Sequence, residues 1–436
     1  MEPCVLLGRP ADKVIPSKDY RLTVNGEDVF VYQCEVASYA ILSAKGPLDI
    51  EIEPLFEYER VKVRPLSLGI KPTREGNKIR FSMDGPGKVS VELDEEFRRP
   101  LFLLVNPVES QIPDRNSPKV HYFEGGKIYD AGIIELKQDE VLYIEAGAVV
   151  YGAVFANHAD NIKIMGRGIL DGSKWPRDEE AKREQLVRLV GCQNVTIEGI
   201  TLVDGPNWHV VPIACRNVSV KDLNVITIVG TGDGIDIVGC ENVEVDNCFV
   251  RSKDDCVAIK ATDYFSPEGC KNVENVHVAN SVFWNAEWGN ALEIGYETRC
   301  EEIKRIHFEN CDVIRCELEG YQSGGTFTIH NGDRARVSQV LYENIRVEDS
   351  REKLIDIKIL HAQYTRDKEK GYVRDIRFKN IQVVDGPFPV SIIRGYDGEH
   401  MIEDVTIEDL IVHGKKITSA NEAKMVVELA KNIRFL

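Results

Sequence analysis

Three aspartates in two neighbouring segments have the residue type and spacing needed for acid–base chemistry. Asp233 lies in GTGDGIDI, and Asp254 and Asp255 lie in SKDDCVAIK, so that 21 positions separate Asp233 from Asp254. Carboxyl groups that share one site disfavour the ionisation of one another, and one of them then keeps its proton to a higher pH than usual. A protonated carboxyl group beside an ionised one is the combination that general acid–base hydrolysis uses.

The two segments must lie side by side for these carboxylates to act together. Adjacent β-strands are about 4.8 Å apart, so residues one coil apart in a stack of strands can meet in one site. Consecutive residues of a regular strand face opposite sides, so we expect the chain to bend at Asp254 and Asp255. Asp236 is interpreted as a structural residue behind Asp233.

A repeated pattern predicts the elements that bring the two segments together. Each repeat has a strand with alternating β-branched residues, a polar corner and a second short strand. The repeats begin at Asn161, Asn194, Asn217, Asn242, Asn275, Arg305, Gln339, Asp375 and Asp404. One repeat cannot bury its apolar face alone, so the repeats must stack. We predict an all-β fold with a right-handed parallel β-helix, or solenoid, as the catalytic domain over residues 120–436, with loops that wall a groove.

One position of the repeat is always small or apolar and is predicted to point inward. It is occupied by Ile200, Leu223, Cys248, Ser281, Cys311, Ile345, Ile381 and Leu410. The Leu-rich consensus and helix of leucine-rich repeats, the main structural rival, are absent from this pattern.

The beginning of the chain has a different pattern. Short alternating runs, such as residues 29–33 and 78–83, are separated by turn signals such as Asn25-Gly26. This predicts a small β-sandwich over residues 1–110 that leads through the polar, proline-containing stretch 106–119 into the helix. No catalytic cluster stands out in it, so we interpret it as an accessory domain that supports the helix.

The 11 cysteines also follow the repeat. Cys192, Cys215, Cys240, Cys270 and Cys300 each stand three residues before a Val or Ile. A recurring position in stacked coils predicts a ladder of small buried thiols, because free cysteine packs as a small hydrophobe. The chain has no CxxC pair, which disfavours a metal site built from these cysteines.

Composition limits the partners of the protein. The net charge is −17, whereas nucleic acids and anionic membranes are bound by clustered basic residues, so neither is expected as a partner. No apolar run approaches the roughly 20 residues of a membrane span, and residues 1–16 lack the pattern of a signal peptide. The expectation is a cytoplasmic protein, or a secreted or periplasmic one if a signal peptide has been removed. The oligomeric state stays open.

Four motifs resemble glycoside hydrolase family 28, the polygalacturonases, and its clan relative family 49, the dextranases. GRGILDGSKW and GPNWHV are similar to the family's G-x-G-x-(I/L)-D-G and S-P-x-x-H. GDGID and KDDCVAI are similar to its N-T-D-G-x-D and D-D-C-(I/V)-A. The resemblance covers roughly residues 120–436, and the motifs occur in the family's order.

The resemblance implies a pectin-lyase-like β-helix that hydrolyses a polysaccharide or oligosaccharide with inversion, without a metal or other cofactor. Asp254 would be the general acid that protonates the leaving oxygen, and Asp233 and Asp255 would activate water. Inverting enzymes hold their acid and base roughly 6.5–9.5 Å apart.

The sequence departs from the family where the sugar would bind. Asn290 replaces the His of G-H-G-x-S-I-G, and Thr328 and His330 stand in place of the R-I-K residues that would grip a uronate carboxylate. We therefore expect a neutral sugar at the cleavage subsite. The candidate substrate-binding residues are His209, Lys260, Asn290, Glu293, Thr328 and His330.

Several of these residues also have a structural interpretation. Glu293 and His330 would each either contact a sugar hydroxyl group or be structural, and Lys260 would either contact substrate or be a solvated corner residue. His209 would either orient Asp233 or Asp255 or be a satisfied buried histidine. Trp284 and Trp288 would either stack on a sugar or cap the core.

Three other functions stay open. A polygalacturonase proper would cleave pectic glycans with the same aspartates. A calcium-dependent polysaccharide lyase would use them as oxygen ligands for Ca²⁺. A non-catalytic binding solenoid would keep the repeats without needing the acids.

Overall fold

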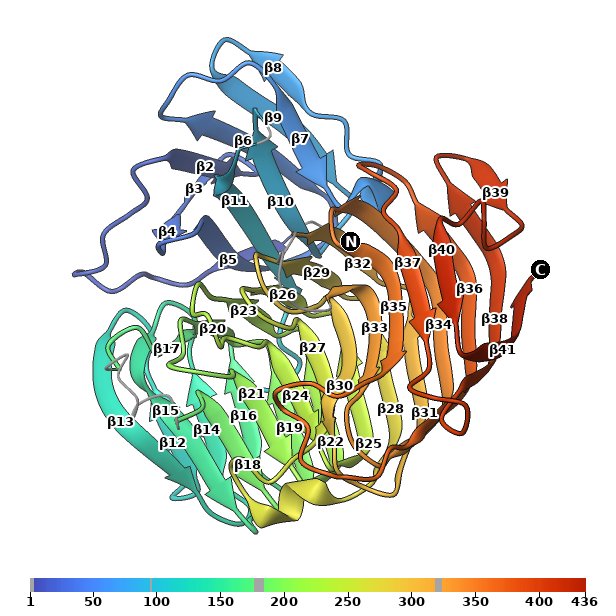
Figure 1. The fold of residues 1–436 in the computed structure, drawn as a ribbon. Helices are drawn as coiled ribbons and strands as arrows, with labels where there is room; N and C mark the ends of the chain where they lie inside the picture. The colour runs from blue at the N-terminus through green and yellow to red at the C-terminus, as the bar shows by residue number, and fades with distance from the viewer. Residues whose placement is uncertain (1–3, 95, 176–183, 318–323) are drawn as a thin grey trace.

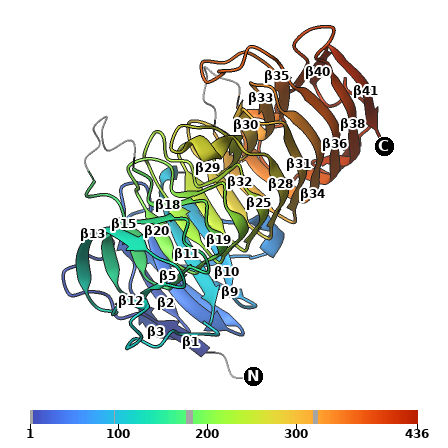
Figure 2. The ribbon, with the colours of Figure 1, turned by 90° about the horizontal axis from the view of Figure 1, so that it is seen from below.

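The computed structural model describes residues 4–94, 96–175, 184–317 and 324–436, and the regular structure in them is almost entirely β-strand. Figure 1 shows a layered domain near the N-terminus (blue) on the side of a long stack of strands that continues to the C-terminus (red). Figure 2 shows from below that the strands follow one another along this stack in sequence order. No helix in the described part of the chain has the length and apolar character of a membrane span.

The first domain is a sandwich of two sheets. One sheet contains, in spatial order, β1 (Cys4–Leu7), β5 (Ser38–Lys45), β11 (Glu96–Pro107), β10 (Gly87–Leu93) and β7 (Val61–Arg64), with β4 (Tyr32–Gln33) paired to β5. The other contains β3 (Glu27–Val29), β2 (Tyr20–Val24), β6 (Leu48–Pro54), β9 (Lys78–Met83) and β8 (Thr73–Glu75). A short 3-10 helix, η1 (Leu66–Leu68), follows β7. Leu22, Ile52 and Val91 belong to the separate core between these sheets.

The rest of the chain forms a parallel β-helix, in which strands of successive coils pair in stacks. The first stack contains β12 (Val120–Phe123), β14 (Val141–Ile144), β16 (Lys163–Gly166), β19 (Gln193–Glu198), β22 (Arg216–Lys221), β25 (Glu241–Asp246), β28 (Val273–Ala279), β31 (Glu302–Glu309), β34 (Arg336–Ser350), β36 (Tyr372–Val383), β38 (Ile402–Val412) and β41 (Ala430–Phe435). The second contains β13 (Ile128–Leu136), β15 (Val149–Asn157), β17 (Ile169–Asp171), β20 (Thr201–Val203), β23 (Asn224–Ile226), β26 (Phe249–Ser252), β29 (Val282–Asn285) and β32 (Asp312–Cys316), and continues into the later parts of β34, β36 and β38.

The third stack carries the predicted catalytic segments. It starts in the later parts of β13 and β15 and contains β18 (Val187–Val190), β21 (Val210–Ile213), β24 (Ile235–Val238), β27 (Val257–Ala261), β30 (Leu292–Thr298), β33 (Gly325–Asn331), β35 (Lys353–Ile359), β37 (Ser391–Arg394) and β40 (Met425–Glu428). A 3-10 helix, η3 (Pro267–Cys270), follows β27, and β39 (Lys415–Ile417) pairs antiparallel with β38. The predicted β-helix and the sandwich before it are both found.

The polar corners explain why asparagine recurs in the sequence. Asn194, Asn217, Asn242 and Asn275 have φ angles of 56°, 57°, 59° and 57°, in the left-handed region that asparagine tolerates better than most residues. The side-chain amide of Asn217 donates to Asn194 at 3.1 Å, and that of Asn275 donates to Asn242 at 2.8 Å. These bonds along the stack fix the register of each coil on the one before it.

The residues predicted to point inward are all buried. They are Ile200, Leu223, Cys248, Ser281, Cys311, Ile345, Ile381 and Leu410.

The predicted cysteine ladder is present only in part. In-register pairing of the coils aligns Cys192, Cys215 and Cys240. The next coil is longer, so Val273 rather than Cys270 follows Cys240, and Cys270 lies in η3. Cys300 aligns with Cys270, so the prediction was wrong for both. All cysteines whose side chains are described are free thiols.

The sandwich packs against the second stack of the helix. Phe102 of β11 joins a buried apolar cluster that extends along the stack from Val149 of β15 to Ile314 of β32. Its ring lies 4.8 Å from that of Phe249 and 5.6 Å from that of Trp284. Trp284 is fully buried in this interface, so of its two predicted roles the structure shows the one in packing.

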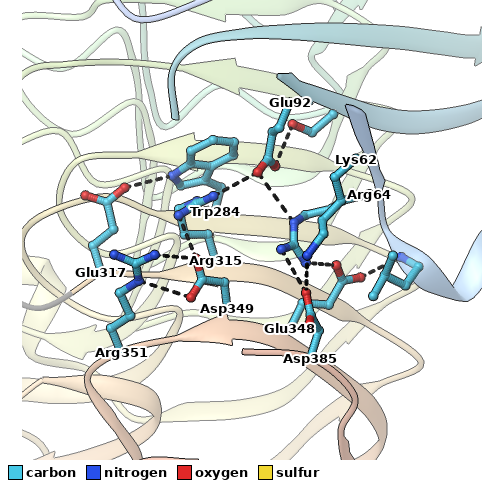
Figure 3. A network of polar contacts seen from close by, with 12 residues as sticks. Lys62, Arg64, Glu92, Trp284, Arg315, Glu317, Glu348, Asp349, Arg351 and Asp385 are labelled. Atoms are coloured by element: carbon cyan, nitrogen blue, oxygen red, sulfur yellow. Dashed lines mark hydrogen bonds and ion pairs between the residues drawn. The ribbon is translucent and has the colours of Figure 1, made fainter. Parts of the chain in front are cut away.

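Buried ion pairs join the same two parts of the chain (Figure 3). Arg315 of β32 lies 2.8 Å from Glu92 of the sandwich and 2.7 Å from Asp349. Arg64 of the sandwich lies 3.5 Å from Glu92 and also pairs with Glu348 of the helix. Their side chains are at most 10% exposed, so removing one partner would leave an uncompensated charge in a desolvated site.

Candidate active site

The predicted catalytic residues lie where the chain enters the third stack. Asp233 precedes β24 and Asp255 precedes β27 on the next coil, and the Gly234 N–H donates to the Asp255 carbonyl at 2.8 Å. Asn290 precedes β30 and continues this row, because its carbonyl accepts from the Cys256 N–H at 2.9 Å. The stacking therefore brings the two acidic segments side by side.

The chain bends between β26 and β27, which lets two consecutive aspartates serve one site. The carbonyl of Asp254 accepts hydrogen bonds from Ser252 Oγ at 2.7 Å and from Asn285 Nδ2 at 2.8 Å. Gly289, with φ of 70°, packs against this bend, and a Cβ atom there would lie 2.4 Å from an Asp254 carboxylate oxygen. Only glycine allows this close approach.

The three carboxylates form one tight cluster. One oxygen of each of Asp233, Asp254 and Asp255 lies within 4.8 Å of the others. A water molecule in this cluster would contact more than one carboxylate.

Lys260 of β27 supplies a buried positive charge to the cluster. Its Nζ lies 2.7 Å from Asp233, 3.3 Å from Asp236 and 3.5 Å from Asp255. The same ammonium group lies 4.0 Å from the centre of the Trp208 ring, a cation–π arrangement. We infer that Lys260 balances the aspartates, which is a different role from the predicted contact with substrate.

Burial and mutual repulsion perturb the acids. Burial, together with Asp233, raises the pKa of Asp255 to about 8, against the opposing effect of Lys260. Burial and Asp233 also raise the pKa of Asp236 well above its usual range. Burial alone would lower the pKa of Lys260, but the surrounding aspartates outweigh it and raise that pKa. The cluster therefore holds protonated carboxyl groups and an ammonium ion together near neutral pH.

Asn290 and His209 orient the aspartates. The Asn290 amide donates to an Asp255 oxygen at 2.7 Å and accepts from the Gly325 N–H at 3.0 Å. His209 Nδ1 donates to the backbone carbonyl of Asp233 at 3.0 Å, while its Nε2 accepts from the Gly205 N–H at 2.9 Å. His209 is fully buried, and burial lowers its pKa to about 4. It fixes the backbone of Asp233 and does not line the cavity, so the structure does not agree with direct sugar binding.

Glu293, Thr328 and His330 are not among the residues that line the cavity, which corrects their prediction as sugar ligands and leaves the structural alternative for Glu293 and His330. All three are fully buried. Thr328 Oγ1 donates to the Leu292 carbonyl at 3.1 Å. His330 Nδ1 lies 3.0 Å from Glu293 and its Nε2 lies 3.2 Å from Asp356, and these carboxylates raise its pKa to about 9 although burial opposes this. The polar atoms of these side chains therefore bond to other protein groups and are not accessible to a sugar.

A cavity of about 610 Å³ opens above the aspartates. Its lining includes Asp233, Asp254, Asp255, Lys260, Asn290, Asn207, Trp208, Tyr264, Phe265, Trp288, Tyr296, Glu297 and Tyr364. Trp288 and Tyr264 are 45% and 38% exposed, so their rings are accessible to stack on a sugar face.

Sequence reasoning did not find several residues of this lining. Glu297 follows the buried strand segment LEIG, and burial raises its pKa despite Lys260. Tyr296 stacks on His330 with ring centres 4.5 Å apart, and Tyr364 reaches it from a later coil. For Tyr296 and Glu297, the one signal in the sequence is an aromatic and an acidic residue that follow the apolar residues of β30.

Comparison with known proteins supports the suspected relationship. Residues 143–432 match the family described as Glycosyl hydrolases family 28. The chain belongs to this family. A probable polygalacturonase from Vitis vinifera is 30% identical over 118 residues, 25% of this chain and 24% of the relative. An exopolygalacturonase from Zea mays is 28% identical over 240 residues, 51% of this chain and 54% of the relative. The matched part thus spans about half or less of these family members.

Solved structures share the whole architecture. Dex49A from Penicillium minioluteum superimposes with a TM-score of 0.67 at 14% identity, covering 99% of this chain and 96% of that one. A family 28 exopolygalacturonase from Yersinia enterocolitica gives a TM-score of 0.55 at 13% identity, with the same two coverages. At identities this low, the superpositions show a common fold and nothing more specific.

Proposed function

We propose that this protein is a glycoside hydrolase that cleaves a polysaccharide or oligosaccharide with inversion at the anomeric carbon. The observation that carries the proposal is the convergence of Asp233, Asp254 and Asp255 in one cavity of a family 28 chain. Residues 120–436 would form the catalytic domain, and residues 1–110 would support it.

Each aspartate has a role that its surroundings favour. Asp254 is partly exposed at the bend and would protonate the leaving oxygen. Asp233 and Asp255 are buried and held by Lys260 and Asn290, so they would orient the attacking water. Asp233, in contact with the ammonium group of Lys260, would accept the proton of that water. Because the carboxylates are so close, a covalent intermediate on Asp233 or Asp255 is the competing mechanism, and it would retain the anomeric configuration.

We further propose that the sugar at the cleavage subsite is neutral. The cavity lining has four acidic side chains, Asp233, Asp254, Asp255 and Glu297, and its one basic side chain among the described residues is Lys260. Lys260 is already surrounded by aspartates, and no arginine lies in the described lining. A uronate carboxylate would therefore find no unpaired positive charge in the described lining, whereas a hydroxyl group would find acceptors.

A polygalacturonase is the second candidate, because curated relatives such as the maize protein carry that name. The calcium-dependent lyase is less well supported, since the ammonium group of Lys260 lies at 2.7 Å from Asp233, where a bound cation would meet it. Family membership also favours hydrolysis.

A panel of polysaccharides tests these proposals. Initial rates on polygalacturonate, neutral α-glucans and galactans would be compared at equal ionic strength, with products measured by mass. Addition of water indicates hydrolysis, an unsaturated product indicates a lyase, and no cleavage indicates a binding solenoid. Proton NMR of the first product then reports inversion or retention. Preferred hydrolysis of polygalacturonate would refute the neutral-sugar proposal and leave the hydrolase intact.

A further inference from the structure

We propose that His277, His307 and Glu309 form a binding site for a divalent transition-metal ion such as Zn²⁺ on the first stack of the helix. One nitrogen or oxygen atom of each residue lies within 4.8 Å of the others. None of the three lines the cavity that holds the catalytic aspartates. The site is therefore separate from the proposed hydrolytic function and can be tested without a substrate.

The strand pattern brings the two histidines together. Val276 and Val278 of β28 point into the core, so His277 between them points outward. His307 of β31 is its direct partner in the parallel register, and the two rings stack with centres 5.0 Å apart. Glu309 lies two residues after His307, on the same face of the same strand. Three metal-binding side chains thus share one outward face.

The donor atom of His307 lies within 4.8 Å of the other two, and one donor–donor distance is already that of a metal site. His277 Nε2 lies 3.0 Å from Glu309 Oε2. Bonds of 2.0–2.1 Å to a tetrahedral Zn²⁺ place neighbouring donor atoms roughly 3.4 Å apart. The side chains of His277, His307 and Glu309 are 34%, 31% and 38% exposed, so they can make small rotations and the ion can enter from solvent. Imidazole with carboxylate is a donor set that Zn²⁺ and its neighbours accept.

A second carboxylate fixes the orientation of His277. Glu244, on the preceding coil, lies 3.2 Å from Nδ1 of His277. Metal-bound histidines commonly donate this other N–H to a carboxylate, which holds the tautomer and aims the free nitrogen at the metal. Glu343 lies 3.4 Å from His307 Nε2 and is a further acidic neighbour, although its other oxygen binds Lys379 at 2.8 Å.

A different histidine provides the matched control. His158 lies 3.0 Å from Glu268, so it also forms a surface pair with a carboxylate. Within the described ranges it belongs to no group of three metal-binding side chains. Replacing His158 therefore removes a histidine–glutamate contact without touching the proposed site.

Titration of the full-length, metal-stripped chain with ZnCl₂ tests the proposal. Excess Mg²⁺ would be present, because it competes for oxygen-only sites such as the aspartate cluster. We expect one equivalent to bind by calorimetry, with affinity at least tenfold lower in His277→Ala and in His307→Ala. Glu244→Ala should weaken binding by about 10- to 100-fold, as for other residues that orient a ligand. His158→Ala should bind as the wild type does.

Two further measurements distinguish binding by these histidines from binding by thiols and from a loss of folding in the variants. Binding of Co²⁺ should give visible bands without the charge-transfer band of thiolate ligands, which excludes the cysteines. Equal melting temperatures in EDTA would show that the variants fold. The proposal fails if no saturable binding occurs, since the contacts would then be ion pairs of protonated histidine. It also fails if the His277→Ala/His307→Ala double variant keeps the wild-type affinity.

Discussion

Replacing Lys260 by methionine should destabilise the protein and should do so most at high pH. The ammonium group contacts Asp233, Asp236 and Asp255 at 2.7, 3.3 and 3.5 Å, and all four side chains are at most 8% exposed. Removing one partner from a buried ion pair costs about 3–5 kcal/mol. One kcal/mol shifts Tm by about 1 °C in a chain of 436 residues, so we expect a fall of about 3–5 °C.

The raised pKa values of the aspartates determine how the loss of stability in Lys260→Met should change with pH. The pKa of Asp255 is already raised to about 8, and that of Asp236 is raised well above its usual range. A raised carboxyl pKa stabilises the fold fully below the unfolded pKa, and this stability is lost as pH rises through the folded pKa. Without Lys260 these acids would have to ionise unpaired. The deficit should therefore be largest above about pH 8 and should shrink toward about pH 5.

Melting curves of wild type and Lys260→Met between these pH values test the reasoning. Lys416→Met is the control, because Lys416 forms a 2.7 Å pair with Asp409 in which both side chains are about half exposed. Such a surface pair contributes about 0–1 kcal/mol. A Lys260→Met variant that melts like the wild type at pH 8, or whose deficit does not decrease toward pH 5, would refute the assigned role.

Three more predictions concern single side chains. Asp254→Asn should lower kcat at least ~10²-fold with little change in Tm, because it removes a transferable proton and nearly preserves shape; near-normal turnover would remove Asp254 from the mechanism. Glu297→Gln should lower kcat/KM on a neutral glycan about tenfold, the difference between a charged and a neutral hydrogen-bond acceptor, and an unchanged value would place Glu297 outside the subsite. Arg315→Met should lower Tm by several degrees while kcat stays unchanged, since it strips a buried partner from Glu92 and Asp349. Equal melting curves would show that these pairs contribute nothing to stability.

The helix could be predicted from sequence because its strands follow a local rule. Each coil repeats the same alternation and the same left-handed corner, so the positions of Ile200 and Leu410 were found from spacing alone. The rule failed where a coil changed length. The coil that contains η3 is longer than the one before it, and this moved Cys270 out of line with Cys240.

Only the site residues that follow the repeat spacing could be predicted from the sequence. Asp233 and Asp255 could be brought together by counting one coil, because both precede a strand of the same stack. The burial of His330 could not be foreseen, since it depends on Tyr296, which stacks over it, and on the acidic partners on each side. Tyr364 reaches the cavity from a loop whose path no periodicity describes.

The packing of the sandwich along the second stack affects how the solenoid can come apart. In a repeat protein each coil touches only its neighbours, so the ends can fray one coil at a time. Here Phe102 and its neighbours form one apolar layer over coils from Val149 to Ile314, and Arg315 adds a charged contact near the end of that layer. Opening one of these coils means lifting it from a surface shared with the others. The sandwich therefore holds these coils together, and amide hydrogen exchange in the coils beneath it should be cooperative. The sandwich also reaches later coils through the ion pairs of Arg64 with Glu348 and Asp385, so only the coils beyond Asp385 should open independently.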